Sequence, residues 1–218
     1  IIIYINGFLL RMSGGPPTFV SFLIKNCGQM NKSFLFDLDG VLVDACDWHY
    51  ESLNLALEEV CGYLITREEH LETFNGLPTL AKLAILKDRG VLKDEDIDRV
   101  SSLKQEYTTD VIKNLCEVDE SKIELITYLK KNGYKVACVT NSIRKTAKLM
   151  LERIGVFHLL DLLISNEDYI KALILLNSLP ENSIIVEDSP KGLEAAMLTG
   201  CRVIQVKNAK EVILENMI

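Results

Sequence analysis

Two aspartates follow an apolar run near the start of the regularly patterned part of the chain. In FLFDLDGVLVD, Asp37 and Asp39 come directly after the strand-like stretch from Ser33 to Phe36, and Gly40 then breaks the pattern. Carboxylates two residues apart repel each other, and a divalent cation that bridges them to a small phosphorylated ligand would relieve the repulsion. Asp and Gly are also ordinary turn residues, and the pair alone favours a simple turn. A functional interpretation therefore needs partners elsewhere in the chain.

Two further polar groups follow apolar runs later in the sequence. Thr140, Asn141 and Ser142 come after YKVACV, and Glu187, Asp188 and Ser189 come after SIIV. In open α/β sheets, ligands bind beyond the carboxyl ends of the strands, so the three groups would face one crevice. Turn formation explains one such group easily and three of them poorly. The sequence therefore predicts one site built from three strand ends.

Predicted strands alternate with predicted helices after Val118. The strand-like segments are YKVACVT, LDLLIS, SIIVED and CRVIQV, with helical patterns between them. This alternation predicts an α/β fold with a Rossmann-like parallel sheet covered on both faces. The strand that ends at Asp37 belongs to this sheet, although a long helical block separates it from the others.

The helical block predicts an insertion into the core domain. Residues 47–116 repeat apolar positions at three- and four-residue spacing without a strand signal. We therefore predict a helical cap domain at 47–116 and a core domain formed by 30–46 and 117–218. Residues 1–29, with their Gly-Gly-Pro-Pro break, differ from both and are either a leader or the remnant of a preceding segment.

The composition narrows the class of protein. The chain has 218 residues, a net charge of −7 and 48% hydrophobic residues, which is typical of a globular protein. The negative charge argues against nucleic-acid binding, which depends on clustered Lys and Arg. No segment has the ~20 apolar residues of a membrane span, and no secretory signal is recognisable. Scattered cysteines without a CxxC pair indicate a reducing compartment, so we expect a cytoplasmic protein without membrane or nucleic-acid partners.

Three motifs resemble those of the haloacid dehalogenase-like (HAD-like) hydrolases. DLDGV at 37–41 is similar to the first motif of that family, VTNS at 139–142 to the second, and VEDSPKGLEAA at 186–196 to the fourth. The resemblance extends over nearly all of 33–206. The inserted helices resemble the helical cap of the subfamily that includes β-phosphoglucomutase and phosphoglycolate phosphatase. The resemblance implies a Rossmann-like HAD core with an inserted α-helical cap.

The resemblance also assigns roles to the matched carboxylates. Asp37 would be the nucleophile that takes the phosphoryl group as an aspartyl phosphate, and Asp39 would be the general acid and base. Mg²⁺ would be held by Asp37, by the backbone carbonyl of Asp39 and by Asp188. Glu187 would lie close by as a further metal ligand.

A second set of matched residues would bind the phosphoryl oxygens. Thr140, Asn141 and Ser142 precede a predicted helix, whose N-terminus would complete an anion site. Ser142 serves equally well as the N-cap of that helix, and Ser189 followed by Pro190 has the form of another N-cap.

The third motif departs from the family pattern. The family carries a lysine there, commonly in a Lys-Pro-x-Pro stretch, and SNEDYIKALILLNSLP lacks that stretch. Either the protein lacks this loop and Lys171 takes its role, or about ten residues between Asp168 and Tyr169 are missing from this sequence. The second explanation is favoured, because YIKALILLN is the kind of helix that follows the loop. Lys171 would then be a solvated charge on that helix.

Two cap residues are candidate substrate contacts. His49 matches a histidine near the hinge of β-phosphoglucomutase-like proteins, although a lone histidine on an amphipathic helix is more often structural. Thr79 stands where the mutases carry an arginine, shortly after Gly76. Its presence argues against a mutase, whose second phosphate needs a cationic clamp. Thr79 and Lys82 could still contact substrate.

These features predict a Mg²⁺-dependent phosphatase that hydrolyses a small sugar or polyol phosphate through an aspartyl phosphate. The alternatives are a β-phosphoglucomutase-like phosphomutase, a dehalogenase, and a non-catalytic binding module that retains the fold. The expected partner is a small phosphorylated metabolite, and the sequence is compatible with either a monomer or a dimer.

Overall fold

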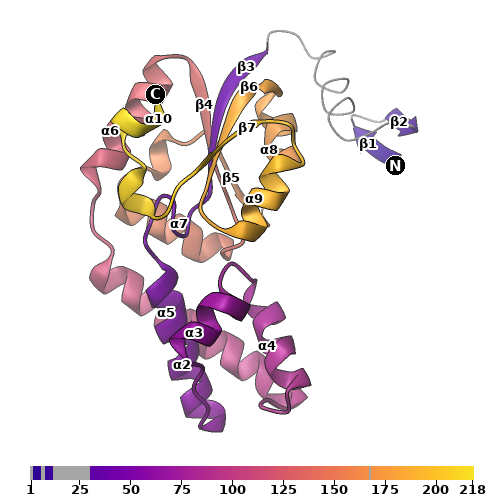
Figure 1. Ribbon diagram of the computed structural model, residues 1–218, viewed down its shortest axis with the longest axis vertical. Helices are drawn as coiled ribbons and strands as arrows, with labels where there is room; N and C mark the ends of the chain where they lie inside the picture. Colours follow the sequence, from indigo (N-terminus) through magenta and orange to yellow (C-terminus); the bar gives the residue numbers. More distant parts are fainter. Residues whose placement is uncertain (1, 6–7, 12–29, 167) are drawn as a thin grey trace.

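The computed structural model describes residues 2–5, 8–11, 30–166 and 168–218 (Figure 1). Two short strands, β1 (Ile2–Ile5) and β2 (Phe8–Arg11), pair antiparallel with each other. Most of 1–29, predicted as a leader or remnant, lies outside the described residues.

A parallel five-stranded sheet forms the centre of the molecule. Its strands are β3 (Asn31–Phe36), β4 (Tyr134–Thr140), β5 (Leu162–Ser165), β6 (Ser178–Glu187) and β7 (Arg202–Gln205), in the order β5-β4-β3-β6-β7. All four neighbouring pairs are parallel. The strand that ends before Asp37 is the central one, so its carboxyl end lies between those of β4 and β6. The predicted α/β fold is confirmed.

The apolar run in β3 is explained by burial on both faces of the sheet. Successive side chains of a strand point to opposite faces. Phe34 and Phe36 belong to one apolar cluster, and Leu35 belongs to another on the other face. The first face is covered by α6 (Glu120–Lys131), α7 (Arg144–Arg153) and the short α10 (Leu214–Met217), and the second by α8 (Tyr169–Leu176) and α9 (Pro190–Met197). Strands of a parallel sheet that is covered on both faces carry near-continuous apolar runs, such as FLF at the end of β3.

The inserted segment is helical and has its own apolar core. It consists of α2 (Cys46–Cys61), α3 (Arg67–Glu69), the π-helical turn η1 (His70–Phe74), α4 (Thr79–Asp88), the 3-10 turn η2 (Asp94–Asp96) and α5 (Ile97–Leu115). Leu53, Leu57, Phe74 and Leu83 pack in a cluster separate from the two clusters of the sheet. In Figure 1 these helices lie beyond one end of the sheet. We therefore propose residues 47–116 as the cap and 30–46 with 117–218 as the core.

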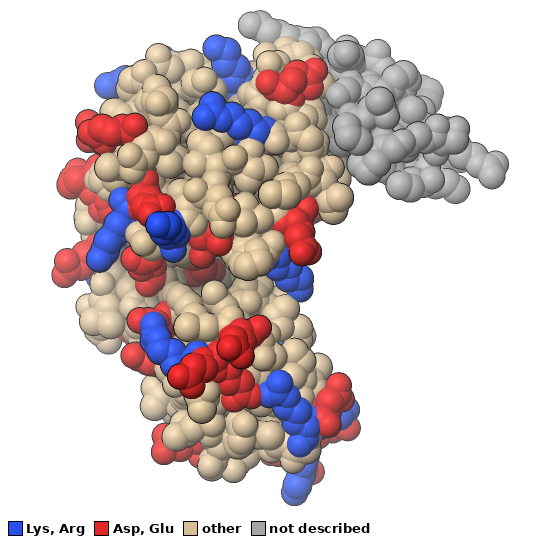
Figure 2. All heavy atoms as spheres, viewed as in Figure 1, with Lys and Arg blue, Asp and Glu red and all other residues tan. Residues whose placement is uncertain are grey.

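The surface agrees with the charge expected from the composition. Over the described part of the face drawn in Figure 2, Lys and Arg side chains are interspersed with Asp and Glu and form no continuous basic patch.

Two further 3-10 turns are η3 (Phe157–Leu159) and η4 (Ala209–Glu211). Within the described residues, no helix combines the length and the apolar character needed to span a bilayer.

Replacing Phe74 with alanine tests the separate core of the cap. Phe74 is fully buried, so Phe74→Ala should lower the free energy of unfolding by about 3–5 kcal/mol in a urea titration. Leu71 lies in the same turn and is 51% exposed, so Leu71→Ala should cost at most about 0.5 kcal/mol. Equal losses for the two variants would contradict the burial of Phe74 in the core of the cap.

Candidate active site

The turn after β3 brings Asp37 against the end of β6. The backbone N–H of Asp37 donates to the carbonyl of Val186 at 3.1 Å, which continues the pairing of the two strands. Gly40 has a φ of +93°, and a Cβ there would clash with the carboxylate of Asp188. Glycine accepts this backbone conformation without strain and lets the two loops approach closely. Gly40 therefore allows the loop after β3 to lie directly against the loop that carries Asp188.

Three carboxylates meet where these loops touch. One oxygen from each of Asp37, Glu187 and Asp188 lies within 4.8 Å of the others. Glu187 is also tied to the protein, because it accepts a hydrogen bond from the backbone N–H of Ser189 at 2.7 Å. Asp188 Oδ1 is buried and has no hydrogen-bond partner within the described residues. These carboxylate oxygens, one of which lacks a hydrogen-bond donor within the described residues, form a set of ligands that suits a hard divalent cation.

Burial and, after it, mutual repulsion raise the pKa values of two carboxyl groups in this cluster. Burial raises the pKa of Asp37 well above its usual range, and the negative charges of Glu187 and Asp39 raise it further. Burial and Glu187 raise the pKa of Asp188 to about 7. Without a cation, the cluster therefore holds protons that isolated carboxyl groups would lose.

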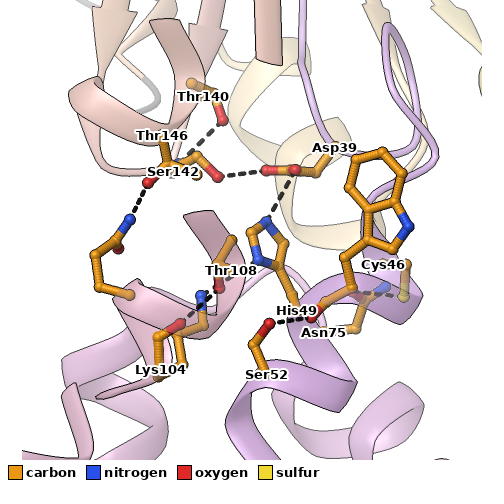
Figure 3. Close-up of polar contacts among 12 residues, drawn as sticks. Asp39, Cys46, His49, Ser52, Asn75, Lys104, Thr108, Thr140, Ser142 and Thr146 are labelled. Carbon is orange, nitrogen blue, oxygen red and sulfur yellow. Dashed lines mark hydrogen bonds and ion pairs between the residues drawn. The ribbon is translucent and has the colours of Figure 1, made fainter. Parts of the chain in front are cut away.

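The side chain of Asp39, beside this cluster, is held by hydrogen bonds to two other segments. Its Oδ2 accepts a hydrogen bond from Ser142 Oγ at 2.6 Å, and its Oδ1 lies 3.0 Å from His49 Nε2 (Figure 3). Burial favours the protonated form of Asp39, but His49 and Ser142 outweigh it and lower the pKa. Both oxygens of the Asp39 side chain are thus engaged within the protein, and its backbone carbonyl is the group that was predicted for the metal contact.

Lys104 of α5 extends this chain of polar contacts into the cap. Its Nζ lies 3.2 Å from His49 Nδ1, so Nδ1 accepts from the ammonium and Nε2 donates to Asp39. Burial lowers the pKa of Lys104 to about 8. Burial, followed by the charge of Lys104, lowers the pKa of His49. Lys104 was not among the predicted site residues. Its spacing could have indicated burial, because it lies four residues from each of Val100 and Thr108 on the buried stripe of α5.

The predicted phosphoryl-binding residues lie at the end of β4. Thr140 is buried, and its hydroxyl accepts a hydrogen bond from the backbone N–H of Ser142 at 3.0 Å. Asn141 Nδ2 donates to the carbonyl of Gly76 at 3.5 Å, which connects the core to the cap. Ile143, not Ser142, occupies the N-cap position of α7, so the N-cap interpretation of Ser142 is wrong.

The hydroxyl of Ser189 behaves as the sequence suggested. It accepts from the backbone N–H of Gly192 at 3.0 Å and caps α9, with Pro190 at the first helical position. This cap fixes the loop that carries Glu187 and Asp188.

A cavity of about 480 Å³ collects these residues between core and cap. All nine predicted site residues line it: Asp37, Asp39, His49, Thr79, Thr140, Asn141, Ser142, Glu187 and Asp188. Lys82 and Lys104 of the cap and Arg144 of α7 also line it. Lys171 is exposed on α8 and does not, so it is not placed to take the role of the third-motif lysine. Asp168 caps α8, which begins at the next residue.

A Rossmann-like sheet with carboxylates at its carboxyl edge and a helical insertion over them defines a class of capped α/β hydrolases. The family model described as haloacid dehalogenase-like hydrolase matches residues 34–206. This chain belongs to that family. The predicted family and the predicted enzyme class, a phosphoric monoester hydrolase of this family, are thereby confirmed.

Curated relatives resemble the chain over most of its length. A phosphorylated carbohydrates phosphatase of Thermotoga maritima is 25% identical over 179 residues, which cover 78% of this chain and 82% of the relative. A pyrophosphatase PpaX of Bacillus cereus is 26% identical over 182 residues, covering 79% of this chain and 81% of the relative. These names agree with the enzyme class and differ in substrate.

Solved structures resemble the fold. A β-phosphoglucomutase from Clostridium difficile superposes with a TM-score of 0.71 at 21% identity, covering 85% of this chain and 95% of the other. CbbY from Rhodobacter sphaeroides, in complex with phosphate, gives a TM-score of 0.70 at 22% identity, with 81% and 86% covered. At these identities the likeness establishes the architecture.

A divalent cation should stabilise the protein more at neutral than at acidic pH. The pKa of Asp188 rises from 3.8 to about 7 on folding, so the cation-free folded state loses stability as the pH rises through that interval. A saturating cation removes this loss and should raise the Tm by roughly 5–10 °C near pH 7.5. Near pH 5 the rise should be smaller, because protons compete with the cation.

The measurement is a thermal melt with MgCl₂ or EDTA at both pH values. Asp188→Asn should lose most of the rise, whereas Asp98→Asn on the exposed surface of α5 should retain it. A larger rise at the acidic pH would contradict the proposed cation site.

Proposed function

We propose that the protein is a Mg²⁺-dependent phosphatase of small sugar or polyol phosphates, with Asp37 as nucleophile and Asp39 as general acid and base. The observation that carries this proposal is the placement of Asp39 beside the cluster of Asp37, Glu187 and Asp188 in one cavity. One carboxylate there can attack phosphorus while a separately held one moves protons.

Asp37 would attack the phosphorus atom in the first step. The bond from phosphorus to the substrate oxygen breaks, the phosphoryl group becomes an aspartyl phosphate, and the leaving oxygen takes a proton from Asp39. In the second step Asp39 takes a proton from water, which attacks the aspartyl phosphate and releases inorganic phosphate with free Asp37. Each step is easier than direct displacement by water.

The hydrogen bonds of Asp39 suit both steps. Ser142 and His49 hold the carboxylate in one orientation and favour its ionised form, which is the form that accepts a proton from water. A phosphate dianion bound next to Asp39 would raise its pKa and favour the protonated form needed for the first step. Proton transfer of this kind contributes about 10²–10⁴-fold to the rate.

A hard cation fits the oxygen donors of Asp37 and Asp188, and Mg²⁺ is the cation that we propose for them. When bound, it would offset the repulsion between carboxylates and phosphate and polarise the phosphoryl oxygens. Glu187 would act mainly by positioning, because backbone hydrogen bonding already engages its carboxylate. The Thr140 and Asn141 segment would bind the phosphoryl oxygens opposite the cation.

The cap would exclude bulk water and select the substrate. Contacts between the two parts already exist: Gln105 of α5 donates to the hydroxyl of Thr146 of α7, and Asn141 donates to Gly76. Closing such a lid protects the aspartyl phosphate from premature loss and completes the site. Thr79 and His49 would lie on the substrate side of the closed cap.

Asp37→Asn should abolish phosphate release, because an amide cannot form the acyl phosphate in this way. The assay measures inorganic phosphate from a panel of sugar, polyol and glycolytic phosphates, with Mg²⁺ or EDTA. Asp39→Asn should lower kcat by about 10²–10⁴-fold. Asp47→Asn is the matched control, since Asp47 is exposed and does not line the cavity.

Wild-type activity in Asp37→Asn would refute the nucleophile, and undiminished activity in EDTA would refute the metal requirement. Activity that appears only when a bisphosphate activator is added would indicate a phosphomutase.

A further inference from the structure

Lys82 is a buried cation that lines the cavity. It lies on the inner side of α4, next to the buried Leu83, and only 6% of its surface is exposed. Within the described residues its amine makes no hydrogen bond and no ion pair. A desolvated ammonium without a partner is costly, so such a group is expected where a ligand supplies the missing charge.

The other cations that line the cavity are already engaged. Lys104 contacts the ring of His49 at 3.2 Å. Arg144 donates to the backbone carbonyl of Leu163 at 2.8 Å, which holds it against the core. Lys82 is therefore the lining cation most available to an anionic ligand.

The charges around Lys82 place it on the Asp39 side of the cavity. The groups that interact with it electrostatically come from four elements and loops: Asp39, Cys46, His49, His70 and Lys104. The groups that chiefly act on Asp37 are instead Glu187, Asp39 and Asp188. Asp39 is the residue that would protonate the leaving oxygen. Lys82 lines the same cavity as Asp39 and would therefore face the part of the substrate that leaves.

We propose that Lys82 binds a second anionic group, carried by the leaving alcohol of the substrate. The preferred substrate would then be a phosphate monoester whose alcohol part bears a carboxylate or a second phosphate, not a neutral sugar or polyol. This inference rests on the proposed phosphatase function and narrows its substrate class. Thr79, at the start of the same helix, also lines the cavity and brings no charge to it, so Lys82 is the cation that α4 supplies there.

The test compares substrates that differ in one anionic group. Glycerol 3-phosphate is paired with 3-phosphoglycerate, and glucose 6-phosphate with 6-phosphogluconate and with glucose 1,6-bisphosphate. The wild type should show at least about tenfold higher kcat/KM for the charged member of a pair, because an ion-paired hydrogen bond contributes that much or more. Preference for 6-phosphogluconate or for the bisphosphate then identifies the anion as carboxylate or phosphate.

The variants are Lys82→Met, Lys82→Arg and the control Lys87→Met. Lys82→Met should lower kcat/KM about 10–100-fold for the anionic substrates and less than about threefold for the neutral ones. Lys82→Arg should restore part of the preference. Lys87 is exposed on the same helix and pairs with Asp94, so its replacement should change neither value.

A binding measurement distinguishes failure of this inference from failure of the proposed phosphatase function. If none of the compounds releases phosphate, the phosphatase proposal fails, and calorimetric titration of 3-phosphoglycerate and glycerol 3-phosphate in MgCl₂ still decides the role of Lys82. Tighter binding of 3-phosphoglycerate that is lost in Lys82→Met supports the inference. Equal binding of the two compounds, or equal losses of kcat/KM for neutral and charged substrates, overturns it.

Discussion

Repulsion among buried carboxylates is the constraint on which the rest of this site depends. Asp37, Glu187 and Asp188 bring their oxygens within 4.8 Å of one another at the carboxyl edge of a buried sheet. In a medium of low dielectric, like charges at this separation cannot all remain ionised without compensation. The protein compensates in part with backbone donors, such as the N–H of Ser189, and leaves one oxygen of Asp188 unsatisfied. The negative charge that these donors leave uncompensated suits a bound cation.

The second half of the site has the opposite charge and comes from the cap. Lys82 and Lys104 lie on α4 and α5, and both are buried at the cavity. His49, near the start of α2, contacts Lys104 through one ring nitrogen and Asp39 through the other. It thereby links the buried lysine of the cap to the carboxylate that would move protons. At the cavity, the carboxylates of the core and the two buried lysines of the cap attract each other, and the lysines attract an anionic substrate between them. Electrostatics therefore favours the closed arrangement around a phosphorylated ligand.

Much of this arrangement was predictable from residue patterns. The buried strand before Asp37 was recognisable because both faces of β3 are covered, which makes its last three residues, FLF, apolar in succession. The strand ends at Thr140 and Glu187 were recognisable from abrupt changes in polarity. Lys104 was missed because a lysine is ordinarily exposed, whereas here it lies on the buried stripe of α5 with Val100, Thr108 and Ile112. The role of Ser142 was ambiguous, because a hydroxyl before a helix caps it in many proteins, and here it bonds to Asp39 instead.

The sequence by itself determined the class of fold, the family and the three groups of residues that meet at the site, since these follow from local patterns of polarity and spacing. The tertiary structure alone decided which side chains face one another across long separations in the chain. It joined Asp39 to Ser142 and His49, and His49 to Lys104. It also turned Lys82 into the cavity and left Lys171 on the surface. Such pairings depend on how α4 and α5 pack over the sheet, and packing of distant elements leaves no mark in local periodicity.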